Sequence, residues 1–283
     1  FLKTGEEIDW TWRSFGEWIE RLSSLPLGIN VGTFVGQGTI RLAVMGFDDR
    51  APSQKELNAM REYARLAMEA GAFGMTSGLG YPPGFFSTDE EIEFVAGGLS
   101  ARGGLYLSHM RNQAEGSPES VAATINVGRV NGIPAQVVHL KAKAADRPDM
   151  ADHLFGIIER ARCEGVDVTV DQYPYTASST TLRTLIPNRL HNNGVAGILA
   201  ALADPERRAE VAQEMRGWPR CMKGIERGIM LMDVPFTPQF RGRSLREAAD
   251  ALGMDEVGAL LEIVSDNKGS DSACFFTLEE EDV

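Results

Sequence analysis

Short apolar runs alternate with longer amphipathic segments from residue 27 to residue 176. The runs AQVV and VDVTV have little polar alternation, which is typical of strands that are covered on both faces. We therefore predict five β-strands, which lie within LGINVGTFVG (27–36), AFGMTSGL (72–79), LYLSHM (105–110), AQVVHLK (135–141) and VDVTVDQYPYT (166–176).

The segments between these runs have helical patterns. In the segment 53–71, apolar side chains recur at helical spacing and form one face. Ser53 with Glu56, and Thr88 with Glu91, have the spacing of a capping box, which predicts the start of two helices. The predicted helices are 53–71, 89–104, 117–132 and 150–165.

The alternation of strands and helices favours an α/β fold with a parallel sheet and helical crossovers. A doubly wound open sheet and a (β/α)₈ barrel of the TIM type both fit it. No strand is followed by GxGxxG, which disfavours a dinucleotide-binding open sheet. In a barrel, the active site is built from polar residues at the carboxyl ends of strands. The barrel fits better, because such residues occur at these ends: Gln37, His109, Arg111, His139, Lys141, Asp171 and Tyr173.

The regular pattern weakens after residue 182. Candidate helices lie within 194–204 and 205–217, and later ones at 244–253 and 256–266, with a short strand at IMLMDV (229–234). We predict that residues 1–182 form a partial barrel and that residues 183–283 form an α-rich insertion or lid.

Composition and charge exclude several classes of function. Hydrophobic residues make up 43% and charged residues 24%, as in an ordinary soluble protein, and no apolar run is long enough to span a membrane. The net charge of −12 argues against a nucleic-acid partner. The three cysteines form no CxxC pair and the start FLKTGEEIDW shows no signal peptide, so we expect a cytoplasmic protein without disulfides.

Two of the four histidines, His109 and His139, end successive predicted strands. Adjacent parallel strands lie about 4.8 Å apart, so both imidazoles can reach one point above the sheet. Imidazole nitrogen is a good zinc ligand, which makes the pair a candidate half of a metal site. We expect His153 and His191 to lie on a helix and in a polar loop, without a role in the site.

Four motifs occur in register along the chain: GAFGMTSGLGYPPGFFSTDEEI, GGLYLSHMR, VVHLK and DQYPYTASST. Together they closely resemble the D-aminoacylase/N-acyl-D-amino-acid deacylase family of the amidohydrolase superfamily, from about Gly28 to the FTLEEEDV end. The resemblance implies a (β/α)₈ barrel with a small β-sandwich, one or two zinc ions, and removal of the acyl group from N-acyl-D-amino acids.

The resemblance also implies roles for individual residues. His109 and His139 match the zinc-binding histidines of barrel strands five and six. Tyr173 matches a catalytic tyrosine that holds or polarises the substrate carbonyl. Lys141 matches a lysine that contacts substrate, and Ser179 lies in a loop that meets the substrate carboxylate.

Three further residues are interpreted within the mechanism that the resemblance implies. Arg111 is a second cation that can bind the substrate carboxylate, and its alternative role is a salt bridge. Asp171, at a strand end, is expected to orient a neighbouring group by hydrogen bonds. The segment YPPGFFST, which begins at Tyr81, is expected to form a loop over the site with a minor substrate role.

The chain departs from the family pattern at several points. It has no His-x-His pair, no cysteine before Leu27 and no Ser-Asp-Gly motif, because the SDN at 265–267 precedes the family-like tail. Gln37 stands where the family commonly has histidine. The chain thus resembles barrel strands three to seven of a longer member, and we expect it to be inactive alone.

Two alternatives stay open. One is an amidohydrolase of the hydantoinase or dihydroorotase type, although the run FGMTSGL lacks the metal-bridging lysine that would mark it. The other is a non-catalytic fragment. The expected partner is a small N-acyl amino acid, and the sequence leaves its identity, the number of metal ions and the oligomeric state open.

Overall fold

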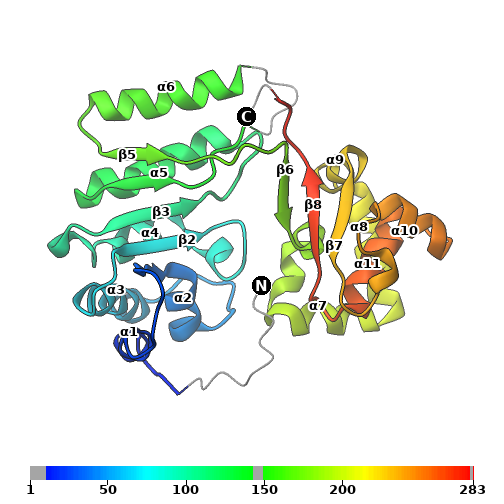
Figure 1. The fold of residues 1–283 in the computed structure, drawn as a ribbon, viewed down its shortest axis with the longest axis horizontal. Coiled ribbons are helices and arrows are strands. Elements are labelled where there is room, and N and C mark those ends of the chain that lie inside the picture. The colour runs from blue at the N-terminus through cyan, green and yellow to red at the C-terminus, as the bar shows by residue number, and fades with distance from the viewer. Residues whose placement is uncertain (1–10, 143–148, 281–282) are drawn as a thin grey trace.

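The computed structural model describes residues 11–142, 149–280 and 283, which form two β-sheets with helices packed against them (Figure 1). The first sheet is parallel and its strands follow one another in chain order. This confirms the predicted parallel sheet. Its strands are β1 (Val35–Gly36), β2 (Gly74–Gly78), β3 (Leu105–His109), β4 (Ala135–Val137) and β5 (Val168–Val170).

The first helix of this part precedes β1, and the others lie between the strands along the chain. From the second helix onward, helices that neighbour one another in sequence are in contact. The capping box at Ser53 forms as predicted, whereas at Thr88 the side chain caps the helix but the carboxylate of Glu91 turns to Arg41. The helices are α1 (Phe15–Ser23), α2 (Gln37–Met45), α3 (Gln54–Glu69), α4 (Asp89–Ala96), α5 (Ser117–Asn131) and α6 (Met150–Cys163).

The register brings the carboxyl ends of the central strands together. Gly78 pairs with His109, and Ser108 pairs with Val137 on the next strand. The close approach of β2 and β3 requires glycine at position 74, because a Cβ atom there would lie 1.8 Å from the carbonyl oxygen of Leu105.

The second sheet is antiparallel, in the order β6-β8-β7, and has its own hydrophobic core. In Figure 1 it stands beside the carboxyl ends of the first sheet, with β6 next to them. Its strands are β6 (Ala177–Thr180), β7 (Ile229–Asp233) and β8 (Ser272–Phe276), and its helices are α7 (Gly194–Ala203), α8 (Pro205–Gly217), α9 (Pro219–Arg227), α10 (Leu245–Leu252) and α11 (Glu256–Asp266).

This second part contains more sheet than the sequence pattern predicts. The elements α7, α8, β7, α10 and α11 coincide with predicted segments, whereas β6, β8 and α9 were not predicted. The first strand of the second sheet, β6, also lies before residue 182, inside the range assigned to the barrel. The division at residue 182 stays a prediction, which hydrogen exchange in the two sheets can test.

Two sequence-based expectations concern parts outside the described residues. One is the expectation that the start FLKTGEEIDW is not a signal peptide. The other is the resemblance to the family at residues 281–282. Within the described ranges, no helix has the length and hydropathy needed to cross a membrane.

Candidate active site at the carboxyl end of the parallel sheet

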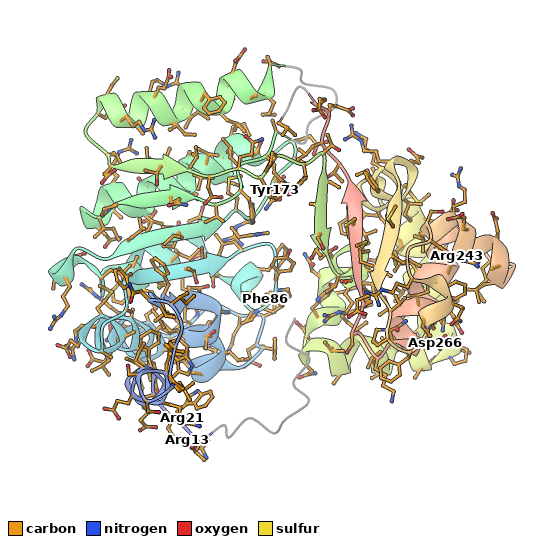
Figure 2. The ribbon with its side chains drawn as sticks, viewed as in Figure 1. Arg13, Arg21, Phe86, Tyr173, Arg243 and Asp266 are labelled. Carbon is orange, nitrogen blue, oxygen red and sulfur yellow. The ribbon has the colours of Figure 1, made fainter. Side chains whose placement is uncertain are left out.

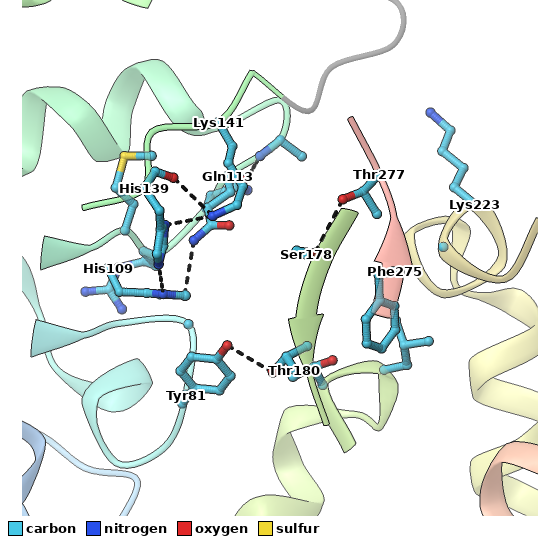
Figure 3. Close-up of a pocket in the computed structure, with 18 of the residues that line it drawn as sticks. Tyr81, His109, Gln113, His139, Lys141, Ser178, Thr180, Lys223, Phe275 and Thr277 are labelled. Carbon is cyan, nitrogen blue, oxygen red and sulfur yellow. Dashed lines mark hydrogen bonds between the residues drawn. The ribbon is translucent and has the colours of Figure 1, made fainter. Parts of the chain in front are cut away.

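The two histidines that the sequence singled out meet at the carboxyl ends of β3 and β4 (Figure 3). Nδ1 of His109 lies 2.7 Å from Nε2 of His139, and the rings stand edge to face with centroids 4.6 Å apart. Both imidazoles are partly buried. The predicted convergence of the pair is therefore present in the fold.

The two histidines do not occupy equivalent positions in the sheet. Because Ser108 pairs with Val137, the residue level with His109 is Val138, and His139 lies one position further along. The backbone of His139 has φ of +41°, in the left-handed region that non-glycine residues rarely adopt. Such a conformation costs roughly 1–3 kcal/mol and persists only where other contacts hold it.

Lys141 fixes the tautomer of His139. Its ammonium nitrogen lies 2.7 Å from Nδ1 of His139 and 3.0 Å from the carbonyl oxygen of the same residue. An ammonium group has donors only, so Nδ1 of His139 accepts, and Nε2 carries the proton that it shares with His109. On the other side, the amide of Gln113 lies 3.2 Å from Nε2 of His109.

Tyr173 is the third predicted residue of this cluster. The ammonium of Lys141 lies 4.7 Å from the centre of its ring, and its ring centroid is 6.4 Å from that of His139. Figure 2 places Tyr173 at the carboxyl end of the parallel sheet, toward β6. Burial raises the pKa of Tyr173, and the hydroxyl of Ser178 offsets this only in part. The phenol therefore stays protonated, and able to donate, at neutral pH.

The segment after β2 forms a loop over the site, as expected. The ring of Tyr81 packs against His109 with centroids 4.9 Å apart, and its hydroxyl lies 3.1 Å from Oγ1 of Thr180 on β6. Gly80 makes room for this arrangement, since a Cβ atom there would lie 2.9 Å from Nε2 of His109. Tyr81 thus has a larger part in the site than the sequence suggested.

Arg111 supports this loop. Its guanidinium donates to the carbonyl oxygens of Phe85 and Ser87, at 2.8 and 2.7 Å, and reaches Asp89 at 3.3 Å. The salt bridge considered for Arg111 is therefore present, while the side chain also lines the cavity described below.

A buried ion pair lies beneath the same loop. Arg41 and Glu91 meet at 2.8 Å with side chains 0% and 1% exposed. The hydroxyl of Ser87 donates to Glu91. The side-chain amide of Gln37 donates to Ser87 and to Glu91. Gln37 is thus buried in the scaffold under the loop and does not line the cavity.

The two sheets enclose a cavity of about 600 Å³. The first sheet contributes the histidine cluster and Tyr173, and the second contributes the opposite wall. Ser179, the predicted carboxylate contact, lies on β6 and lines this wall. Other lining residues that sequence reasoning missed include Gln113 after β3 and, in the second part, Leu185, Trp218, Lys223 and Phe275. The last four have no local sequence signal, because their place at the cavity depends on how the second sheet packs.

Lys223 on α9 also reaches across the cavity mouth. Its ammonium lies 3.9 Å from the carboxylate of Glu115, in the segment that follows β3. The remaining two histidines lie away from the site, as expected: His153 is exposed on α6, and the Nε2–H of His191 donates to the carbonyl oxygen of Ile186 at 3.3 Å. Burial lowers the pKa of His191.

The histidine pair fits two positions of a zinc site. Two nitrogens at zinc-bond distance around a tetrahedral ion lie about 3.3 Å apart, so the rings need to part by roughly 0.6 Å to admit it. In the ranges 11–142 and 149–280, no group of three or more His, Cys, Asp or Glu side chains is arranged to hold a metal ion. Within these ranges, the histidine pair therefore offers two candidate metal ligands.

Comparisons with known proteins point to one family. The chain matches no protein-family model. It is 36% identical over 169 residues to a D-aminoacylase of Alcaligenes xylosoxydans xylosoxydans, covering 60% of this chain and 35% of that protein. An N-acyl-D-glutamate deacylase of the same organism is 38% identical over 161 residues, covering 57% and 32%.

Solved structures agree with the sequence matches. An N-acyl-D-glutamate deacylase from Bordetella bronchiseptica, complexed with zinc and a phosphonate that mimics the tetrahedral intermediate, has a TM-score of 0.74 at 27% identity. The match covers 95% of this chain and 48% of that protein. A D-aminoacylase crystal structure gives 0.72 at 26% identity with the same coverage, and another D-aminoacylase study concerns a binuclear metal centre.

The chain spans about a third of the length of these curated relatives and about half the length of the solved ones. The parallel sheet corresponds to part of their TIM-type barrel, which confirms the predicted fold class. The motifs, the sheet and these similarities show that the chain belongs to the D-aminoacylase/N-acyl-D-amino-acid deacylase family of the amidohydrolase superfamily.

Proposed function

We propose that the complete protein is a zinc-dependent hydrolase that removes the acyl group from N-acyl-D-amino acids. The observation that carries the proposal is the contact between His109 and His139, at 2.7 Å, beside Lys141 and Tyr173 in one cavity. The similarity to deacylases supports the reaction type, and the solved relative that contains zinc supports the metal.

His109 and His139 would hold the metal through Nδ1 and Nε2, the two nitrogens that face each other. This requires the proton of His139 to move from Nε2 to Nδ1 and the ammonium of Lys141 to stop donating to Nδ1. Zinc, when bound, polarises a carbonyl oxygen and lowers the pKa of bound water. Tyr173 would donate its proton in a hydrogen bond to the substrate carbonyl, where negative charge develops during attack. Its raised pKa favours this role, because the hydroxyl keeps its proton to a higher pH than an ordinary tyrosine.

The cavity favours a substrate with a carboxylate. Its lining includes the cations Arg111, Lys141, Lys223 and Arg227 and the acid Glu115, although the whole chain has a net charge of −12. Lys141 and Ser179 are the proposed carboxylate contacts. Arg111 is proposed as a third, and it would need to keep its hydrogen bonds to the loop while it binds.

The hydantoinase or dihydroorotase alternative receives less support. Strand β2 reads GMTSG and carries no lysine to bridge two metals, and the similar proteins are a D-aminoacylase and deacylases of N-acyl-D-glutamate and N-acyl-D-aspartate. The non-catalytic alternative is favoured for the chain by itself. Its described residues bring two histidines together but place no third His, Cys, Asp or Glu with them to complete a metal site. The cytoplasmic location stays a prediction.

The test is an assay of the complete, zinc-loaded protein on N-acetyl-D- and N-acetyl-L-amino acids in matched pairs. We expect free amino acid from the D substrates, and loss of both zinc and activity in the H109A/H139A variant. The control is H153A, which changes an exposed histidine on α6 and should match the wild type. Hydrolysis of cyclic amides in place of these substrates, or zinc content that is unchanged in H109A/H139A, would contradict the proposal.

A further inference from the structure

The position of His139 poses a geometric problem that the fold has to solve. Successive residues of a strand point to opposite faces of the sheet. Since Val138 is level with His109, an uninterrupted β4 would put Val138 on the face of His109 and would turn His139 toward the helices. The imidazole of His139 nevertheless meets that of His109.

The left-handed backbone at His139 resolves this conflict. Strand β4 ends at Val137, and the φ of +41° two residues later redirects the chain, so that the ring of His139 returns to the face of His109. A single histidine in this conformation is strained unless hydrogen bonds hold its peptide groups.

Asp171, just beyond the end of β5, provides those hydrogen bonds. Its carboxylate oxygen Oδ1 accepts from the backbone N–H of His139 at 2.5 Å, and its carbonyl oxygen accepts from the next N–H, that of Leu140, at 2.8 Å. Its own N–H donates to the carbonyl oxygen of Val137 at 3.2 Å. The residue therefore ties down both sides of the redirected segment.

The carboxylate of Asp171 is itself held in place. Its second oxygen, Oδ2, accepts a hydrogen bond from the side-chain amide of Gln136 on β4. The carbonyl oxygen of that amide accepts from the hydroxyl of Thr169 on β5 at 3.3 Å. Gln136 and Thr169 are register partners, so this chain of contacts connects the two strands on one face.

We propose that Asp171 is a positioning residue that accepts the hydrogen bond of the His139 amide and thereby aims the His139 imidazole at His109. The expected effect on zinc affinity rests on the proposed function. The hydrogen bond and the position of the ring do not depend on it. A role as general base is disfavoured, because both carboxylate oxygens already accept hydrogen bonds from the protein.

The experiment uses the whole chain labelled with ¹⁵N-histidine, which gives only four backbone amide signals because the chain has four histidines. The signal that disappears in H139Q belongs to His139. In the wild type we expect this amide proton far downfield and protected from exchange. In D171A it should move upfield and exchange faster, and the ring nitrogen signals of His109 and His139 should shift as their contact is lost.

Two variants separate hydrogen bonding from other effects. D171N keeps an oxygen acceptor for the His139 amide, so its spectrum should stay close to that of the wild type. D167A removes an exposed aspartate at the opposite end of the same strand and should leave all four signals unchanged. A His139 signal that is the same in D171A and the wild type would overturn the proposal.

Zinc titration of the same samples gives the second readout. We expect zinc affinity to fall about 10- to 100-fold in D171A, the usual effect of losing a group that orients a metal ligand, and to recover in D171N. Equal loss in D171A and D171N would overturn the hydrogen-bond role. If the wild type binds no zinc but the amide still responds to D171A, the positioning role is supported and the proposed metal site is wrong.

Discussion

At the scale of single residues, the buried ion pair beneath the loop is a feature with a large expected effect on stability. Arg41 donates to Glu91 and to the carbonyl oxygens of Asp48 and Arg50, at 3.1 and 2.8 Å for the latter two. A buried ion pair adds little stability against an apolar replacement, but removal of one partner leaves an uncompensated charge. The pair therefore makes the loop that carries Tyr81 sensitive to mutation.

We expect R41M to lower the free energy of unfolding by about 3–5 kcal/mol, because it leaves Glu91 buried without its cation. Urea unfolding followed by circular dichroism measures this. The matched control is R65M, which breaks exposed pairs with Glu62 and Glu69 and should lower the free energy of unfolding far less. Equal effects of the two variants would contradict the importance of burial.

The site residues differ in how far the sequence could predict them. His109, His139, Lys141 and Tyr173 were predicted from motifs at strand ends, and the fold brings these four together. The left-handed turn at His139 could not be predicted, because a polar residue after a strand has the same local pattern whatever its backbone conformation. The number of residues between the strand and His139 determines which face the side chain points to only when the strand register is known.

At the scale of elements, the parallel sheet depends on a close contact between two strands. Gly74 begins β2 opposite Leu105, and the backbone atoms of Leu105 occupy the space of a side chain. The run AFGMTSGL predicted a strand but gave no reason for this glycine. The partner residue, Leu105, is thirty-one positions away in sequence, and its carbonyl group sets the requirement.

We expect G74A to destabilise the chain by several kcal/mol, since the added Cβ atom would force β2 away from the carbonyl group of Leu105. Urea unfolding is again the measurement. The control is G156A, within α6, where a Cβ atom meets nothing within 4 Å. That variant should gain roughly 0.5–1 kcal/mol from helix propensity. A stable G74A would show that the two strands can separate without cost.

Elements of the second sheet were harder to predict than those of the first. The run ASST of β6 contains no apolar residue larger than alanine, and the run SACFF of β8 is short. Such strands form because each pairs with a distant segment, as Ser179 does with Cys274. Pairing across almost a hundred residues leaves no local periodicity from which to read it.

At the scale of the whole molecule, the cavity exists because two separately packed layers face each other. The core around the second sheet shares no residue with the two clusters around the parallel sheet. The first sheet carries the histidine cluster, and the second supplies much of the opposite wall. This arrangement supports two cooperative units that meet at the site.

We expect L231A, in the second core, to raise local opening in that core alone. Leu231 is fully buried on β7, and loss of a buried leucine side chain costs about 2–5 kcal/mol. Hydrogen exchange read by mass spectrometry should show faster exchange in β7 and β8 and unchanged exchange in β2 and β3. Faster exchange in both sheets would contradict two units and the division near residue 182.

The sequence by itself determined the parallel βα pattern, the order of the strands and the residue types at their carboxyl ends. These depend on local periodicity and on motifs that a short stretch of chain contains. The tertiary structure alone decided the left-handed turn that brings His139 to His109, the hydrogen-bond partners of Asp171, the scaffold role of Gln37 and the wall formed by β6, β8 and α9. These depend on strand register and on the packing of distant segments, and neither leaves a signal in the local sequence.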